Sequence, residues 1–159
     1  MKEKLHSICV LLGSNIEAEK NLPQTISLLK KQVTIVQLSS VWESKAIGSD
    51  GPNFLNAAVL ITSPLDASSF KTQILSPLEN QMGRLRTLDK NSPRTIDLDI
   101  IIFDMNVLDQ NLWRYAHCAV PVSEIFPDYT DETGESLKNR ASSLASPISI
   151  WRKENVNLS

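Results

Sequence analysis

Ile8-Cys9-Val10-Leu11-Leu12 is an uninterrupted apolar run near the start of the chain, and Gly13 follows it. Branched side chains dominate the run, and no polar residue alternates with them. Such a pattern is typical of a strand that is covered on both faces. We therefore predict a central strand over 8–12 that ends at Gly13, with the other elements arranged on either side of it.

The segments after this run predict one helix and two strands. Asn21 can cap a helix that extends to Lys31. A strand is predicted over 33–41, a loop over 43–53 and a second long strand over 54–62. The chain therefore begins with the order strand, helix, strand, strand.

A second helix is predicted from Ser63 towards Met82. Ser63-Pro64-Leu65-Asp66 combines a capping serine, a proline in the first turn and an acid three residues after the cap. Ser76-Pro77 repeats this signal, so a kink or a restart is expected near Ser76, because proline removes a backbone hydrogen bond. A loop over 85–94 then leads to a strand over 95–103.

The order β-α-β-β-α-β over residues 8–103 is that of a ferredoxin-like α+β sandwich, a mainly antiparallel sheet with helices packed on it. Beyond it, a short helix over 136–144 and a tail strand over 148–151 are predicted, and Val120-Pro121 is interpreted as a break. We expect a single domain over residues 1–159. This architecture alone implies no function.

Composition and charge exclude several classes of protein. No apolar run approaches the ~18 residues that span a bilayer, and the net charge of −2 gives no overall attraction to nucleic acid. Cys9 and Cys118 are too few for a disulfide framework, so both are expected to be reduced thiols. We expect a cytoplasmic monomer without a membrane or nucleic-acid partner.

The strand over 95–103 carries two acids. Strict alternation places Ile96, Leu98, Ile100 and Ile102 on one face, and Asp97, Asp99 and Ile101 on the other. Like charges about 6–7 Å apart on one face need water or a cation beside them, and carboxylates at this spacing suit Mg²⁺. From this pattern alone, a metal site and a solvated edge strand are equally plausible.

Basic residues directly precede these acids. Residues 84–94 contain four basic side chains, Arg84, Arg86, Lys90 and Arg94, and a single acidic one, Asp89. Guanidinium groups and a lysine beside a Mg²⁺-binding acid pair could hold a polyphosphate. The alternative is a solvated basic loop.

The chain also carries short motifs in a fixed order. They are Leu12-Gly13-Ser14-Asn15, Ser39-Ser40-Val41-Trp42, Phe54-Leu55-Asn56-Ala57-Ala58-Val59, Met82-Gly83-Arg84-Leu85-Arg86 and Pro93-Arg94-Thr95-Ile96-Asp97-Leu98-Asp99. Through these motifs, the chain resembles the 6-hydroxymethyl-7,8-dihydropterin pyrophosphokinase family over residues 8–103. His117 and residues 120–127 add a weaker match.

The resemblance implies a Mg²⁺-dependent enzyme of folate biosynthesis that transfers pyrophosphate from ATP to the hydroxymethyl group of the pterin and releases AMP. By position, Asp97 and Asp99 would hold two Mg²⁺ ions, while Arg84 and Arg94 would clamp phosphates during catalysis. The resemblance also implies nucleotide contacts from Glu79, Arg86, Lys90 and His117, and pterin contacts from Ser44, Ile47, Phe54 and Asn56. Without it, Phe54 would be interpreted as a core residue and Asn56 as the partner of a backbone group.

The chain departs from the family's pattern after His117. The family usually has an arginine and a second pterin-stacking phenylalanine there, whereas here Val120-Pro121 follows almost at once. We therefore expect one face of the pterin to be uncovered, unless Trp113, Tyr115, Phe126 or another residue replaces the missing ring. Zinc or thiol chemistry at His117-Cys118 is disfavoured, because a closed zinc site needs four ligands.

Two other functions are considered. One is a relative that binds ATP but has lost or altered its pterin activity. The other is a ferredoxin-like interaction or RNA-binding module, which is disfavoured because no paired aromatic signature for base stacking is present.

Overall fold

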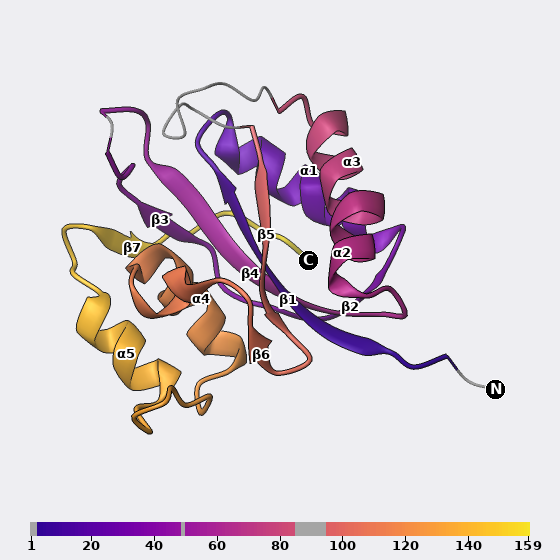
Figure 1. Cartoon of the computed structure of the whole chain (residues 1–159). Helices are drawn as coiled ribbons and strands as arrows, with labels where there is room; N and C mark the ends of the chain where they lie inside the picture. The colour runs from indigo at the N-terminus through magenta and orange to yellow at the C-terminus, as the bar shows by residue number, and fades with distance from the viewer. Residues whose placement is uncertain (1–2, 49, 85–94) are drawn as a thin grey trace.

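The computed structural model describes residues 3–48, 50–84 and 95–159. Within these residues the chain forms one seven-stranded sheet in the order β6-β5-β1-β4-β3-β7, with β2 also paired to β4, and every pairing is antiparallel (Figure 1). The strands are β1 (His6–Ser14), β2 (Thr34–Leu38), β3 (Trp42–Ser44), β4 (Phe54–Ser63), β5 (Asp97–Phe103), β6 (Asn106–Val107) and β7 (Ile150–Arg152).

Helices cover both faces of this sheet (Figure 1). They are α1 (Ala18–Lys30), α2 (Ala67–Phe70), a π-helical turn (Lys71–Leu75), α3 (Ser76–Gln81), a 3₁₀ turn (Gln110–Trp113), α4 (Ala116–Ile125) and α5 (Leu137–Leu144). The first four pack on one face, and the last three pack on the other. The predicted α+β sandwich, mainly antiparallel, is confirmed.

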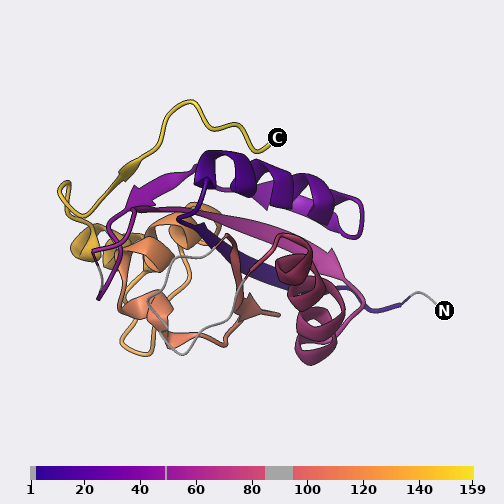
Figure 2. The same ribbon diagram turned by 90° about the horizontal axis from the view of Figure 1, so that it is seen from above.

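The predicted central strand explains both cores. β1 lies between β4 and β5, and its residues 8–12 are all buried. Ile8, Val10 and Leu12 enter the core beneath α1, while Cys9 and Leu11 enter the core beneath α4. Seen from above, the segment beyond β7 runs back over α1 (Figure 2), and Leu158 packs into the core on that face.

The predicted strand over 33–41 is wrong in its length. β2 ends at Leu38, and β3 runs from Trp42 to Ser44, so its last two residues lie in the predicted loop over 43–53. The Ser39 side chain accepts a hydrogen bond from Ala58 N at 2.7 Å, and Ser39 N donates to Ala58 O. This contact separates the two strands, and β3 carries Ser44 along β4 towards the site.

Two predicted helix starts also differ from the structure. α1 begins at Ala18, and the Asn21 amide lies inside it and donates to Ile16 O at 2.6 Å. α2 is capped by Asp66, whose carboxylate accepts from Ser69 N, whereas Ser63 Oγ accepts from Leu65 N in the preceding turn. The restart near Ser76 is confirmed, because α3 begins there after the π-helical turn.

The strict alternation predicted for 95–103 holds as far as Ile101 and fails at Ile102. β5 pairs Cys9 with Ile102 but Val10 with Ile100, so one extra residue is inserted. Ile101 and Ile102 therefore both belong to the core beneath α4, whereas Ile100 packs on the opposite core. The irregularity lies after the two acids, so Asp97 and Asp99 still face the same side.

The interpretation of Val120-Pro121 as a break is wrong. α4 contains Pro121 in its interior, and residues 118–122 are all buried. A proline inside a helix removes one backbone hydrogen bond. Burial of a nearly continuous apolar segment outweighs that loss. The predicted helix over 136–144 is confirmed as α5, with Ser136 as its cap, and the tail strand is β7.

Candidate active site

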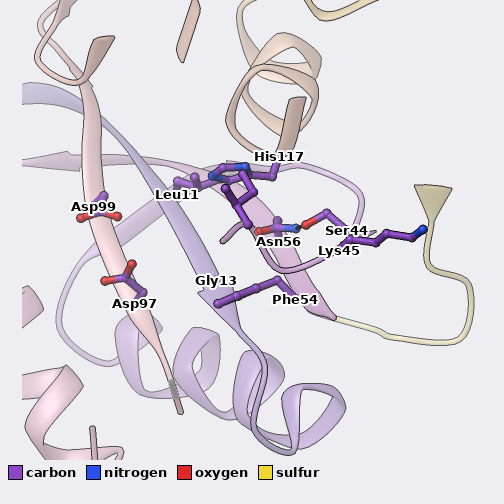
Figure 3. A pocket seen from close by; sticks show the side chains of 10 residues that line it. Leu11, Gly13, Ser44, Lys45, Phe54, Asn56, Asp97, Asp99 and His117 are labelled. Atoms are coloured by element: carbon purple, nitrogen blue, oxygen red, sulfur yellow. Dashed lines mark hydrogen bonds between the residues drawn. The ribbon is translucent and has the colours of Figure 1, made fainter. Parts of the chain in front are cut away.

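A pocket opens where β1, β4 and β5 lie side by side, beside the end of β3 and the first turn of α4 (Figure 3). Its volume is about 170 Å³. The residues that line it are Leu11, Gly13, Ser44, Lys45, Ile47, Phe54, Asn56, Asp97, Asp99 and His117. The structure thus brings together seven predicted site residues from four separate parts of the sequence.

One end of this pocket, which we call the ring end, is neutral and consists of Ser44, Phe54, Asn56 and His117. Asn56 is only 2% exposed, and its amide nitrogen donates to Ser44 Oγ at 2.8 Å and to Trp42 O at 3.2 Å. These two bonds hold the amide in one orientation. Within the described residues, nothing donates to Asn56 Oδ1, so the oxygen is available as an acceptor.

Gly13 explains how the ring end stays open. A Cβ atom at Gly13 would lie 3.7 Å from Asn56 Oδ1 and 3.8 Å from Phe54 Cδ1. The bare glycine backbone therefore leaves room beside the amide and the ring. Gly13, Leu11 and Lys45 were not predicted as site residues. The motif around Gly13 was the only sequence signal for any of them.

The other end of the pocket, which we call the acid end, consists of Asp97 and Asp99 on β5. Figure 3 shows both carboxylates on the pocket side of that strand. Asp99 keeps contact with water, but surrounding protein displaces part of its hydration and raises its pKa to about 7, and the charges of Asp97, Asp109 and Glu79 act in the same direction. Two neighbouring carboxylates in this position favour a bound cation.

Arg84 lies beside the acid end rather than among the residues that line the pocket. Its Nη1 donates to Asp97 Oδ1 at 2.6 Å and also to Glu79 Oε2. Glu79, which is 3% exposed, also accepts from the backbone N–H of Leu98 through Oε2. The predicted phosphate clamp and the predicted nucleotide contact are thus joined to β5 by one network of charged groups.

His117 is in the first turn of α4, at the ring end of the pocket. Its ring stacks on Tyr115 with centroids 5.5 Å apart and planes inclined by 25°. Burial lowers its pKa, although the negative charges of Asp109 and Asp97 oppose this effect. The imidazole is therefore neutral at pH 7.

Other predicted residues do not enter this geometry. Trp113 and Phe126, considered as replacements for the missing aromatic residue, pack against the core beneath α4. Arg86, Lys90 and Arg94 lie outside the described residues. Their predicted roles remain predictions.

The described parts of the chain contain neither a metal cluster nor a membrane-spanning helix. They contain no group of three or more histidine, cysteine, aspartate or glutamate residues that could hold a metal ion. No helix among residues 3–48, 50–84 and 95–159 is long and apolar enough to cross a membrane. Cys9 and Cys118 are both free and buried, as expected for reduced thiols, and burial raises the pKa of each.

Comparison with known proteins identifies the family. The model of the 7,8-dihydro-6-hydroxymethylpterin-pyrophosphokinase family matches residues 9–127. The chain belongs to this family. The match includes all the pocket residues and continues through the segment after His117, so the resemblance seen in the sequence is confirmed.

Curated pyrophosphokinases of this family are similar to the chain. The 2-amino-4-hydroxy-6-hydroxymethyldihydropteridine pyrophosphokinase of Synechocystis is 31% identical over 140 residues, which cover 81% of the chain and 71% of that protein. The enzyme of the same name from Bacillus subtilis is 37% identical over 99 residues, which cover 60% of the chain but only 58% of that enzyme. The relatives are thus diphosphotransferases, as predicted.

A solved structure shares the fold. The crystal structure of the Plasmodium falciparum HPPK-DHPS protein with pteroate superposes with a TM-score of 0.67 at 9% identity. The superposed region covers 90% of this chain and 43% of the Plasmodium chain. At this identity the likeness supports the fold alone.

Proposed function

We propose that the chain transfers pyrophosphate from ATP to the hydroxymethyl group of 6-hydroxymethyl-7,8-dihydropterin in folate biosynthesis. The observation that carries this proposal is the two-ended pocket of a family member. The neutral ring end suits a flat heterocycle, and the acid end suits metal-bound phosphates. A pterin at the ring end would direct its hydroxymethyl group towards the acid end.

At the ring end, Asn56 and Phe54 would select the pterin. The Asn56 amide is already held by Ser44 and Trp42, so little conformational entropy is lost when its Oδ1 accepts a hydrogen bond from the pterin edge. The Phe54 ring beside Gly13 offers a face for stacking. Ile47, which is 51% exposed, would cover the bound ring from the rim of the pocket.

At the acid end, the side chains fit Mg²⁺. Asp97 and Asp99 provide hard oxygen ligands, and the negative charges of Asp97 and Glu79, which add to burial in raising the pKa of Asp99, favour a cation there. Two carboxylates do not complete a metal site, so phosphate oxygens and water would supply the other ligands. We propose that two Mg²⁺ ions bind here together with ATP. Bound Mg²⁺ would neutralise phosphate charge and align the reacting groups.

The reaction itself is a displacement at phosphorus. The hydroxymethyl oxygen forms a bond to the β-phosphorus of ATP, the bond from that phosphorus to the α,β-bridging oxygen breaks, AMP leaves with the bridging oxygen, and the hydroxyl proton passes to water. Arg84, held beside Asp97, adds a fixed positive charge next to the phosphates. Arg86, Lys90 and Arg94 would add further phosphate contacts, and Glu79 would hold Arg84 in place.

Incubation with ATP, Mg²⁺ and the hydroxymethyl pterin, followed by AMP analysis, tests the proposal. We expect AMP and pterin pyrophosphate in equal amounts, no AMP when the pterin is omitted, and AMP formation lowered on the order of 10³-fold in Asp97→Asn. Asp128→Asn, at an exposed position outside the pocket, is the matched control and should behave like wild type. Binding of Mg-ATP without pterin-dependent AMP would instead support the relative with lost pterin activity.

Three further properties remain predictions from sequence. They are the cytoplasmic location, the monomeric state and the organisation of residues 1–159 as one domain. Sedimentation of the purified chain would test the monomeric state.

A further inference from the structure

The pocket has a flat side chain on each of two walls. In Figure 3, His117 lies on one side of the Asn56 amide and Phe54 lies on the other. Phe54 comes from the start of β4, whereas His117 comes from the first turn of α4. The two rings therefore enclose the space into which Asn56 Oδ1 faces.

His117 is held in this position by its neighbours. Tyr115 stacks on its ring at 5.5 Å, and Cys118 and Ala119, the next residues of α4, are fully or almost fully buried. A ring that is already fixed loses little entropy when a ligand stacks on it.

α4 is also tied to the strand that carries the polar edge of the pocket. Glu124 accepts a hydrogen bond from Trp42 Nε1 at 2.6 Å and another from Ser40 N at 2.8 Å. Trp42 in turn accepts from Asn56, which also binds Ser44. The wall formed by His117 and the edge formed by Asn56 are thus parts of one connected framework.

We propose that His117 is the second wall of the ring slot and covers the pterin face opposite Phe54. This inference rests on the proposed function, and it assigns His117 to the pterin instead of the nucleotide. The other aromatic candidates, Trp113 and Phe126, pack in the core beneath α4. α4 starts at Ala116, so His117 stands in its first turn, and its imidazole lines the pocket.

The test is calorimetric titration of wild type and variants with the pterin and, separately, with a Mg²⁺ complex of a non-hydrolysable ATP analogue. His117→Ala should weaken pterin binding by roughly tenfold, because one stacking surface is lost. His117→Phe should keep or improve pterin binding. Neither substitution should change the affinity for the nucleotide by more than about twofold.

His6 supplies the matched control, since it is the only other histidine of the chain. It lies on β1, pairs with Asp104 at 2.5 Å and does not line the pocket. His6→Ala should leave pterin affinity unchanged. Thermal unfolding of each variant establishes that it is folded under the conditions of the titration.

Three outcomes would overturn the inference. Unchanged pterin binding by His117→Ala would show that the imidazole is not a wall. Loss of nucleotide binding in both His117 variants, with pterin binding intact, would make His117 a nucleotide ligand. Wild type that binds Mg-nucleotide but not pterin would overturn the proposed function together with the inference, whereas the first two outcomes leave the proposed function standing.

Discussion

The two ends of the pocket are built by opposite physical means. At the ring end, the Asn56 amide nitrogen makes both of its donor contacts within the protein, to the uncharged Ser44 Oγ and Trp42 O. At the acid end, Asp97 and Asp99 share one side of β5, and burial together with the charge of Asp97 raises the pKa of Asp99. The hydrogen bonds that orient the ring end are formed before a ligand binds. At the acid end, by contrast, a bound cation would reduce the repulsion between the carboxylates.

This difference indicates how binding is divided between the two ends. Preformed hydrogen bonds at the ring end favour selection of one heterocycle. Unbalanced negative charge at the acid end favours a cation and the phosphates that accompany it. Substitutions at one end should therefore change a different measured quantity from substitutions at the other.

Removal of a carboxylate at the acid end should have the largest effect. Asp97→Asn or Asp99→Asn should lower turnover on the order of 10³-fold, because metal-ion charge stabilisation contributes several kcal/mol to phosphoryl transfer. Steady-state AMP formation measures this, with Asp128→Asn as the control. Near-normal turnover of either variant would remove the acid end from the mechanism.

Arg84 should connect the acid end to stability. Arg84→Met should lower the free energy of unfolding by about 2–4 kcal/mol, because Glu79 and Asp97 lose their shared cation in a mostly buried network. Denaturant unfolding measures the change. Arg114→Met, at an exposed position, should have almost no effect, and an equal loss in the two variants would contradict the network.

A substitution at the ring end should weaken the binding of the pterin. Asn56→Ala should raise the KM for the pterin by about 10- to 100-fold, because the acceptor is lost and Ser44 loses its partner. The KM for ATP should stay nearly constant. Kinetics with each substrate varied in turn measure the two constants, and equal changes in both would show that the two ends do not act separately.

The smallest expected effect concerns pH and the metal-free protein. The pKa of Asp99 is about 7 in the folded chain against 3.8 ordinarily, so the folded state binds more protons between these values. The stability of wild type should therefore fall as pH rises from about 4 to about 7. Asp99→Asn should not lose stability in this way, and its free energy of unfolding should exceed that of wild type by up to about 1 kcal/mol. The value is small because water screens the exposed carboxylate.

Unfolding in the presence of a chelator at several pH values measures this gain. It should be absent near pH 4 and complete near pH 8. A gain that does not vary with pH would show that the ionisation of Asp99 is not its cause. Asp97→Asn should show no such gain, because Asp97 pairs with Arg84.

Local sequence signals predicted the elements of the fold well where one residue type dominated. The apolar run over 8–12 predicted the central strand, and the repeated start signal predicted the restart at Ser76. Local signals failed where contacts between residues far apart in the sequence decide the structure. The helix through Pro121 is stabilised by burial in the core beneath α4, and the split between β2 and β3 follows from the contact of Ser39 with Ala58.

The sequence by itself determined the family, the α+β class and most of the pocket residues, because motifs and alternation are properties of neighbouring positions. The tertiary structure alone decided how the ends of the pocket are made. It placed Arg84 between Glu79 and Asp97, bent β5 after the acids through the extra residue opposite β1, and set His117 across from Phe54. These relations join residues far apart in the chain, and their geometry depends on the packing of the whole sheet and its helices.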